Sequence, residues 1–187
     1  MQKILILVGS PRRKGNSVDM AEMLMNRLRG EGFHTEMLFL YDCDILPCMD
    51  CRACKKGALV CTVEDGMRDL YFRLEEADIL VFGNPIYWFG PTAKTKLLVD
   101  RLRPYYGNKK LSGKKAALLL PAGSGASDCD LTMEMFTRTF KALGIEYIGA
   151  ASAMAYDAGD AIKDPKTSQA VRELAEAIKG KFPAKVS

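Results

Sequence analysis

Four cysteines lie within fourteen residues of one another. Cys48, Cys51 and Cys54 form a Cys-x2-Cys-x2-Cys run, and Cys61 follows after six further residues. Iron–sulfur clusters are held by four thiolates, so such a run lets one loop supply three ligands while a fourth cysteine closes from nearby. The spacing leaves three alternatives open: a zinc site of four thiolates, a redox pair such as Cys48 with Cys51, and four free thiols.

A second candidate for chemistry is the loop GSPRRKGNS at residues 9–17, which follows an apolar run and precedes a helical pattern. The N-terminus of a helix presents free N–H groups and a positive dipole end, so this loop is suited to a phosphate. Neither a Walker A loop nor a dinucleotide fingerprint fits, because Lys14 and Pro11 stand where those motifs need glycine. Asn16 or Ser17 is a suitable N-cap, and a capped helix without a ligand would give the same pattern. The side chains that suit a phosphate monoester are Ser10, Arg12, Asn16 and Ser17.

Two later loops also follow apolar runs. The sequence NPIYW at residues 84–88 offers flat apolar side chains, although a core or subunit contact would have the same composition. The sequence PAGSG at residues 121–125 is a glycine-rich turn. A phosphate loop, an aromatic ledge and a backbone-rich turn together suit a flat heteroaromatic ligand with a phosphorylated chain, and FMN is such a ligand.

The elements that must position these loops alternate along the chain. Short apolar runs predict strands over residues 3–9, 34–40, 78–84, 115–123 and 145–151. Amphipathic stretches predict helices over residues 17–29, 67–75, 92–102, 131–143 and 168–179. This alternation predicts an α/β fold: a flavodoxin-like doubly wound, five-stranded parallel sheet in the order 2-1-3-4-5, with ligands at the carboxyl ends of the strands. We expect one FMN-binding domain over residues 1–187, with a cysteine-rich insertion after strand 2, the loop 41–66, on the same edge as the other loops.

Composition and charge narrow the class of protein. The chain has 187 residues and a net charge of +4, and its basic residues are scattered without a nucleic-acid-binding motif, so no nucleic-acid partner is expected. The N-terminal apolar run, residues 4–8, is too short for a signal peptide or a membrane span, which favours a cytoplasmic protein with no membrane partner. His34, the one histidine, is expected on the surface, and Cys43 and Cys129 fall outside the cysteine run.

These motifs resemble the NADPH-dependent FMN reductases of the flavodoxin-like superfamily, and the cysteine run resembles their iron-sulfur flavoprotein subgroup. The resemblance implies that the FMN phosphate is held by Ser10, Arg12, Asn16 and Ser17. It implies a flavin ring lined by Pro85, Ile86, Tyr87 and Trp88, with the remaining edge formed by Ala122, Gly123 and Ser124. It also implies a [4Fe-4S] cluster on Cys48, Cys51, Cys54 and Cys61.

The function implied is that of an FMN-dependent oxidoreductase whose cluster exchanges single electrons with FMN, so that the flavin carries the chemistry and no side chain is assigned as catalytic. One alternative is an NAD(P)H-dependent FMN or quinone reductase without a cluster. Another is a redox carrier or sensor that binds FMN and a metal but turns over no substrate. Expected partners are a small-molecule electron acceptor or donor, a ferredoxin, and further copies of the chain in a homodimer or homotetramer, with Tyr105 and Tyr106 as contact residues.

Overall fold

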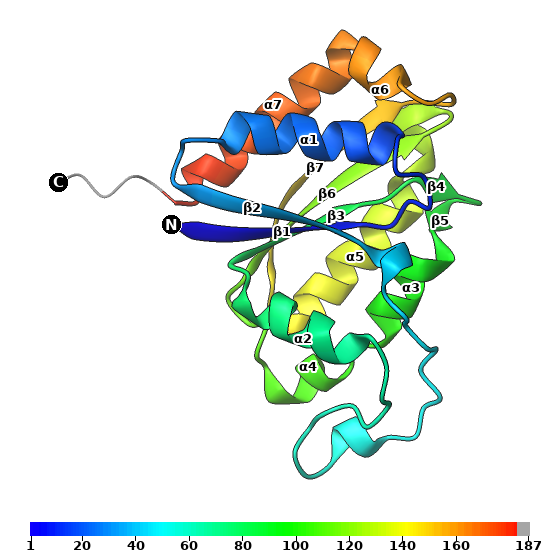
Figure 1. The fold of residues 1–187 in the computed structure, drawn as a ribbon, viewed down its shortest axis with the longest axis vertical. Helices are drawn as coiled ribbons and strands as arrows, with labels where there is room; N and C mark the ends of the chain where they lie inside the picture. The colour runs from blue at the N-terminus through cyan, green and yellow to red at the C-terminus, as the bar shows by residue number, and fades with distance from the viewer. Residues whose placement is uncertain (183–187) are drawn as a thin grey trace, which may run out of the picture.

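The fold is built on one parallel sheet, seen in the computed structural model, which describes residues 1–182 (Figure 1). The strands are β1 (Gln2–Val8), β2 (Phe33–Phe39), β3 (Ile79–Gly83), β6 (Lys115–Ala122) and β7 (Glu146–Met154). Their order in the sheet is β2-β1-β3-β6-β7, and all four pairings are parallel. This confirms the predicted order 2-1-3-4-5.

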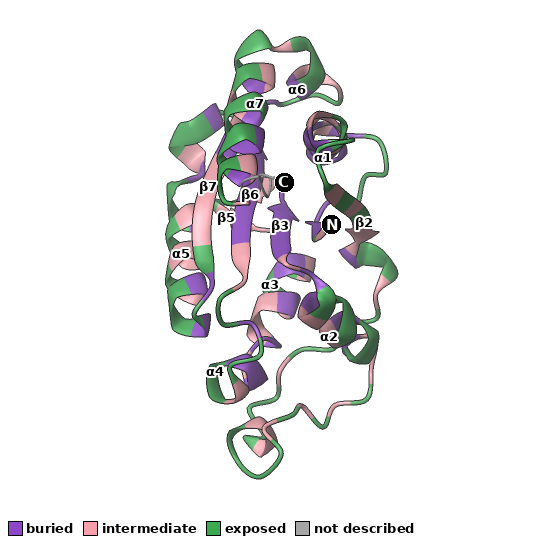
Figure 2. Cartoon of the chain, turned by 90° about the vertical axis from the view of Figure 1, so that its left-hand side faces the viewer, coloured by how far each residue is buried: buried purple, intermediate pink, exposed green. Residues whose placement is uncertain are grey.

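Helices cover both faces of the sheet (Figure 1). One face carries α1 (Asn16–Leu28), α6 (Asp160–Lys163) and α7 (Pro165–Gly180). The other carries α2 (Met67–Glu76), α3 (Ala93–Asp100), α4 (Pro104–Asn108) and α5 (Asp130–Leu143). Both faces of the central strands are therefore buried, as Figure 2 shows for β3 and β6. In β1, Leu5 and Leu7 pack into one core while Ile4 and Ile6 pack into the other, which explains why this strand is apolar throughout.

Some short elements were not predicted. A hairpin of β4 (Ile86–Tyr87) and β5 (Gly90–Pro91) follows β3, and α4 and α6 are single short helices. The last helix begins at Pro165, earlier than predicted, because the Asp164 side chain accepts hydrogen bonds from the N–H groups of Lys166 and Thr167. No helix among residues 1–182 is long and apolar enough to cross a membrane.

Two single-residue predictions have different outcomes. His34 is exposed, as predicted. Tyr105 was expected at a subunit contact, and this is wrong, because its ring is buried against Tyr71 with 5.6 Å between ring centroids. Its hydroxyl donates to Glu75 Oε1 at 3.2 Å, so Tyr105 belongs to the core, while its neighbour Tyr106 is exposed.

The cysteine-rich loop 41–66 has little regular structure apart from short 3₁₀ turns at Leu40–Asp42 and Ala53–Lys55. It leaves the carboxyl end of β2, runs beyond α2 and α4, and returns to the start of α2 (Figure 1). Its two ends meet, because Gly66 N–H donates to the carbonyl of Asp44 at 2.7 Å. A Cβ at Gly66 would lie 2.8 Å from that carbonyl oxygen, so the close approach requires glycine.

Candidate functional site

A cavity of about 430 Å³ lies at the carboxyl edge of the sheet. The loops that follow β1, β3, β6 and β7 form its wall, as expected at the switch point of a doubly wound sheet. Nine of the residues predicted to bind FMN line it: Ser10, Arg12, Asn16, Ser17, Pro85, Ile86, Tyr87, Ala122 and Gly123. Trp88 and Ser124 are both exposed, and neither of them lies on this wall.

The N-terminus of α1 forms the polar end of this cavity. The helix begins at Asn16 after an N-cap at Gly15 and has no side-chain cap, so the prediction that Asn16 or Ser17 caps it is wrong. The first N–H groups of a helix have no partner within the helix. The Ser17 hydroxyl is buried and, within residues 1–182, has no hydrogen-bond partner. A buried hydroxyl normally has a partner, and an anionic oxygen at this end would supply one.

Asn16 joins two loops of the cavity. Its Nδ2 donates to the carbonyl of Asp157 at 2.9 Å, and its Oδ1 accepts from Ala161 N–H at 3.1 Å. One amide hydrogen therefore remains for a ligand. The segment it holds includes Tyr156, which also lines the cavity and was missed from the sequence. Its place after the fifth strand, at the same edge as the other loops, was the signal that could have found it.

A buried polar network lies where the loops after β1 and β3 meet α3. Thr92 Oγ1 donates to the carbonyl of Gly9 at 2.6 Å, and Thr95 Oγ1 donates to Asn84 Oδ1 at 2.6 Å. A Cβ at Gly9 would lie 2.0 Å from Thr95 Oγ1 and 2.1 Å from Asn84 Oδ1. The residue at position 9 must therefore be glycine for the two loops to come together.

The hairpin after β3 has an unusual turn. Tyr87 pairs with Gly90, and the two residues between them, Trp88 and Phe89, have φ angles of 50° and 62°. A two-residue turn of this kind favours Asn-Gly, and each non-glycine residue in the left-handed region costs about 1–2 kcal/mol. Trp88 is 95% exposed at the tip. The turn thus holds two large apolar side chains outward at a local energetic cost.

The four clustered cysteines lie apart from this cavity. All four are free thiols, and none lines the cavity at the carboxyl edge. Cys54 borders a cavity of about 640 Å³ beside α3, α4 and α5, and Cys61 borders another of about 400 Å³ beside α2 and α4. The expectation that the cysteines share an edge with the flavin loops is therefore wrong for a single chain, because the loop turns away along α3 and α4 after leaving β2 (Figure 1).

The cysteines lie near one another without enclosing a common point. Burial raises the pKa of the Cys54 thiol, and the nearby Cys61 and Cys48 thiols raise it further. Among residues 1–182, no three His, Cys, Asp or Glu side chains are arranged to hold a metal ion. The donor set of four thiols on one loop nevertheless matches a thiolate-bound cluster in chemistry.

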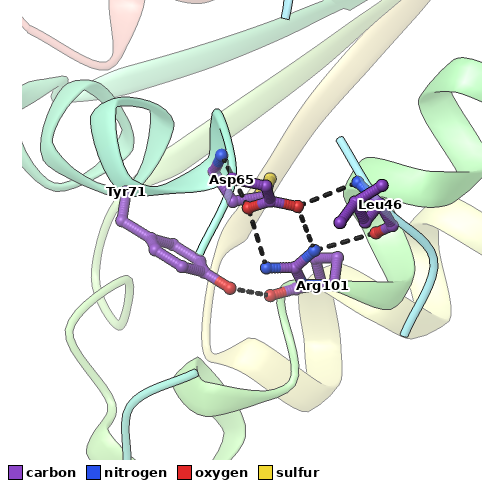
Figure 3. Close-up of polar contacts among 5 residues, drawn as sticks. Leu46, Asp65, Tyr71 and Arg101 are labelled. Carbon is purple, nitrogen blue, oxygen red and sulfur yellow. Dashed lines mark hydrogen bonds and ion pairs between the residues drawn. The ribbon is translucent and has the colours of Figure 1, made fainter. Parts of the chain in front are cut away.

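A buried ion pair closes the neck of the cysteine-rich loop (Figure 3). Arg101 Nη1 and Nη2 donate to the Asp65 carboxylate at 2.6 and 3.1 Å, and their side chains are 1% and 0% exposed. The same carboxylate accepts from the N–H groups of Leu46 and Met67, and Arg101 Nη1 also donates to the Leu46 carbonyl at 2.8 Å. Burial opposes ionisation of Asp65, but these donors hold the pKa of its carboxyl below the usual value. Arg101 was not predicted as a functional residue, since it lies 36 residues from Asp65 in the sequence.

Comparison with known proteins identifies the family of the chain. Residues 2–159 match the NADPH-dependent FMN reductase family. An iron-sulfur flavoprotein of Archaeoglobus fulgidus is 30% identical over 184 residues, which cover 96% of this chain and 82% of the relative. One from Methanocaldococcus jannaschii is 29% identical over 74% of this chain and 71% of its own length. The solved structure of RosB with bound 8-demethyl-8-formylriboflavin-5'-phosphate has the same fold, with a TM-score of 0.72 and 20% identity over 98% of this chain and 82% of that one. The chain belongs to the NADPH-dependent FMN reductase family and is a flavin-dependent oxidoreductase.

Proposed function

We propose that this oxidoreductase exchanges single electrons between FMN and a [4Fe-4S] cluster held by Cys48, Cys51, Cys54 and Cys61. The observation that carries the proposal is the set of four free thiols on one loop, at the spacing of a cluster motif. The similarity to proteins named iron-sulfur flavoproteins supports it. None of the four cysteines lines the cavity at the carboxyl edge.

FMN fits the cavity at the carboxyl edge in size and chemistry. A volume of about 430 Å³ lies within the range of small-molecule sites. Its polar end has helix α1 without a side-chain cap and a Ser17 hydroxyl without a partner in the described residues 1–182, which suit the phosphate with Ser10, Arg12 and Asn16. Its apolar wall of Pro85, Ile86 and Tyr87 suits the ring, with Ala122 and Gly123 at the edge. When bound, FMN supplies hydride and electron-transfer chemistry, while the chain orients the flavin and restricts access to it.

Replacing Ser17 with alanine tests the phosphate site. We expect FMN binding to weaken by about tenfold or more, because a hydrogen bond to a charged oxygen contributes about 1.5–3 kcal/mol. The FMN-free variant should be as stable as the parent, since it loses a buried hydroxyl that has no partner within residues 1–182. Flavin titration by fluorescence measures the first effect, and thermal unfolding of FMN-free protein measures the second. Ser168→Ala is the control, because Ser168 accepts a hydrogen bond from Arg27 and lies outside the cavity wall. Equal FMN affinity in the two variants would show that Ser17 does not bind the phosphate.

Anaerobic reconstitution tests the cluster. Protein incubated with iron and sulfide without oxygen should bind about four irons per chain and show charge-transfer absorption beside the flavin bands. Single Cys→Ser changes at the four positions should each lower the iron content sharply. Cys43→Ser is a matched control, since Cys43 lies on the same loop, outside the motif, and its thiol donates to the Phe39 carbonyl. A wild-type protein that retains FMN but binds no iron under these conditions would exclude the cluster.

A second candidate function is an NAD(P)H-dependent FMN or quinone reductase that works without a cluster. The observation in its favour is that no residue of loop 41–66 lines the cavity at the carboxyl edge. In that case, the four single Cys→Ser variants of the cluster motif would reduce quinones with NADPH as fast as wild type. A loss of electron transfer to one-electron acceptors such as ferredoxin in those variants would favour the cluster-dependent function.

A further inference from the structure

Three side chains from residues 101–108, here called the 101–108 platform, hold the cysteine-rich loop. Arg101 bonds both ends of the loop through Leu46 and Asp65. Asn108 Nδ2 donates to the Leu59 carbonyl at 3.1 Å, between the third and fourth cysteines. The third member, Arg103, contacts the loop beside the first cysteine. The backbone on both sides of the cysteines is therefore fixed by side chains more than thirty residues away in the sequence.

Arg103 is the member of the platform that reaches a sulfur. Its Nη1 donates to Asp50 Oδ1 at 2.6 Å and lies 3.8 Å from Cys48 Sγ. Among residues 1–182, Cys48 is the one cysteine of the four that accepts a hydrogen bond from a charged side chain. The Arg103–Asp50 pair is partly exposed, so alone it contributes little to stability. The ion pair with Asp50 orients the Arg103 guanidinium toward the Cys48 thiol.

The contact with sulfur gains strength only when Cys48 binds a metal. A protonated thiol is a weak acceptor, whereas a metal-bound thiolate is an anionic one, and hydrogen bonds to charged acceptors are about twice as strong as neutral ones. Hydrogen bonds to cluster sulfurs and nearby charge are among the factors that set the reduction potential of an iron–sulfur cluster. Reduction adds one negative charge to the cluster, so a donor cation beside it stabilises the reduced form more than the oxidised form.

We propose that Arg103 is a positioning residue that donates an N–H to the Cys48 sulfur of the cluster and raises the cluster's reduction potential. This inference rests on the proposed function, because it requires a cluster on these cysteines. The step it affects is the transfer of one electron from a reductant to the oxidised cluster, with no bond broken and no proton moved.

A redox titration of reconstituted protein with dithionite, followed by electron paramagnetic resonance, tests the proposal. At a fixed ambient potential, Arg103→Gln should lower the ratio of reduced to oxidised cluster about tenfold, equivalent to about 59 mV for one electron. Arg103→Lys, which keeps the charge but not the planar fork, should lie between Arg103→Gln and wild type. Lys109→Gln is the charge-matched control, since it removes one positive charge at the residue that follows the platform, and the Lys109 ammonium lies over the Tyr106 ring.

The outcomes separate this inference from the proposed function. If wild type binds no iron, the cluster itself fails and the inference fails with it. If all variants bind iron and Arg103→Gln has the same midpoint as Lys109→Gln, the cluster stands and the role of Arg103 is overturned. If Arg103→Gln binds no iron, Arg103→Lys decides: a midpoint below that of Lys109→Gln supports the role, and an equal midpoint contradicts it.

Discussion

Replacing Asp65 with alanine is expected to lower the free energy of unfolding by about 3–5 kcal/mol, because it leaves the Arg101 charge buried without its partner. The loss is large because both side chains are almost fully buried and the carboxylate also accepts from Leu46 and Met67 N–H. Urea unfolding of metal-free protein followed by circular dichroism measures it. The neck of the cysteine-rich loop should also open, and faster proteolysis between residues 46 and 65 would report this.

The reason for that loss can be tested separately from its size. A double variant, Asp65→Leu with Arg101→Met, should recover part of the stability, since a well-packed apolar pair can replace a buried ion pair.

Because the pKa of Asp65 in the folded state is below its usual value, the pair contributes stability above about pH 4 and loses it as the pH falls through the lowered pKa. The difference between wild type and Asp65→Ala should therefore narrow in acid. A difference below about 1 kcal/mol at neutral pH would contradict the assignment of this pair as the neck of the loop.

Replacing Gly9 with alanine is expected to cost about 3 kcal/mol and to abolish FMN retention. The added methyl group would overlap the buried Thr95 hydroxyl and Asn84 amide oxygen, and overpacking of a filled interior costs about 1–3 kcal/mol before any hydrogen bond is lost. Separating those groups also moves the loops after β1 and β3, which together form the phosphate end and the ring wall. Flavin content after purification and urea unfolding of FMN-free protein measure the two effects.

Gly180→Ala is the control for this change. Gly180 ends α7, and among residues 1–182 a Cβ there would meet no heavy atom within 4 Å. This variant should keep its flavin and be at least as stable as wild type, because alanine is a better helix former than glycine. A Gly9→Ala protein with flavin content and stability equal to those of Gly180→Ala would show that the network does not join the loops.

The sheet could be predicted because its signals are local. The central strands β1 and β3 are short apolar runs with helices on both faces, so they stand out from the amphipathic stretches around them. The crossover rule favours a doubly wound sheet, and 2-1-3-4-5 is the strand order of the flavodoxin-like class. The position of the cavity could then be predicted as well, because the loops at the carboxyl ends of these strands meet at one edge.

The direction of the cysteine-rich loop could not be predicted in the same way. It is set by contacts with Arg101, Arg103 and Asn108, which lie between 36 and 55 residues from their partners in the sequence. Trp88 was placed on the flavin wall because it follows a central strand, but the left-handed turn at its own position carries it outward. Neither of these backbone directions is recorded in the periodicity of the sequence.

Because the two ends of the cysteine-rich loop meet, evolution can replace the segment between them without moving the rest of the fold. Leu46 N–H donates to the Asp65 carboxylate, and Arg101 donates to both residues, so a different segment between them starts and ends at the same place. Reducing residues 47–64 to a four-residue turn would change the loop-closure entropy by only about 1.3 kcal/mol. Insertions and deletions at this point can therefore add or remove the thiols while the flavin half of the protein is inherited unchanged.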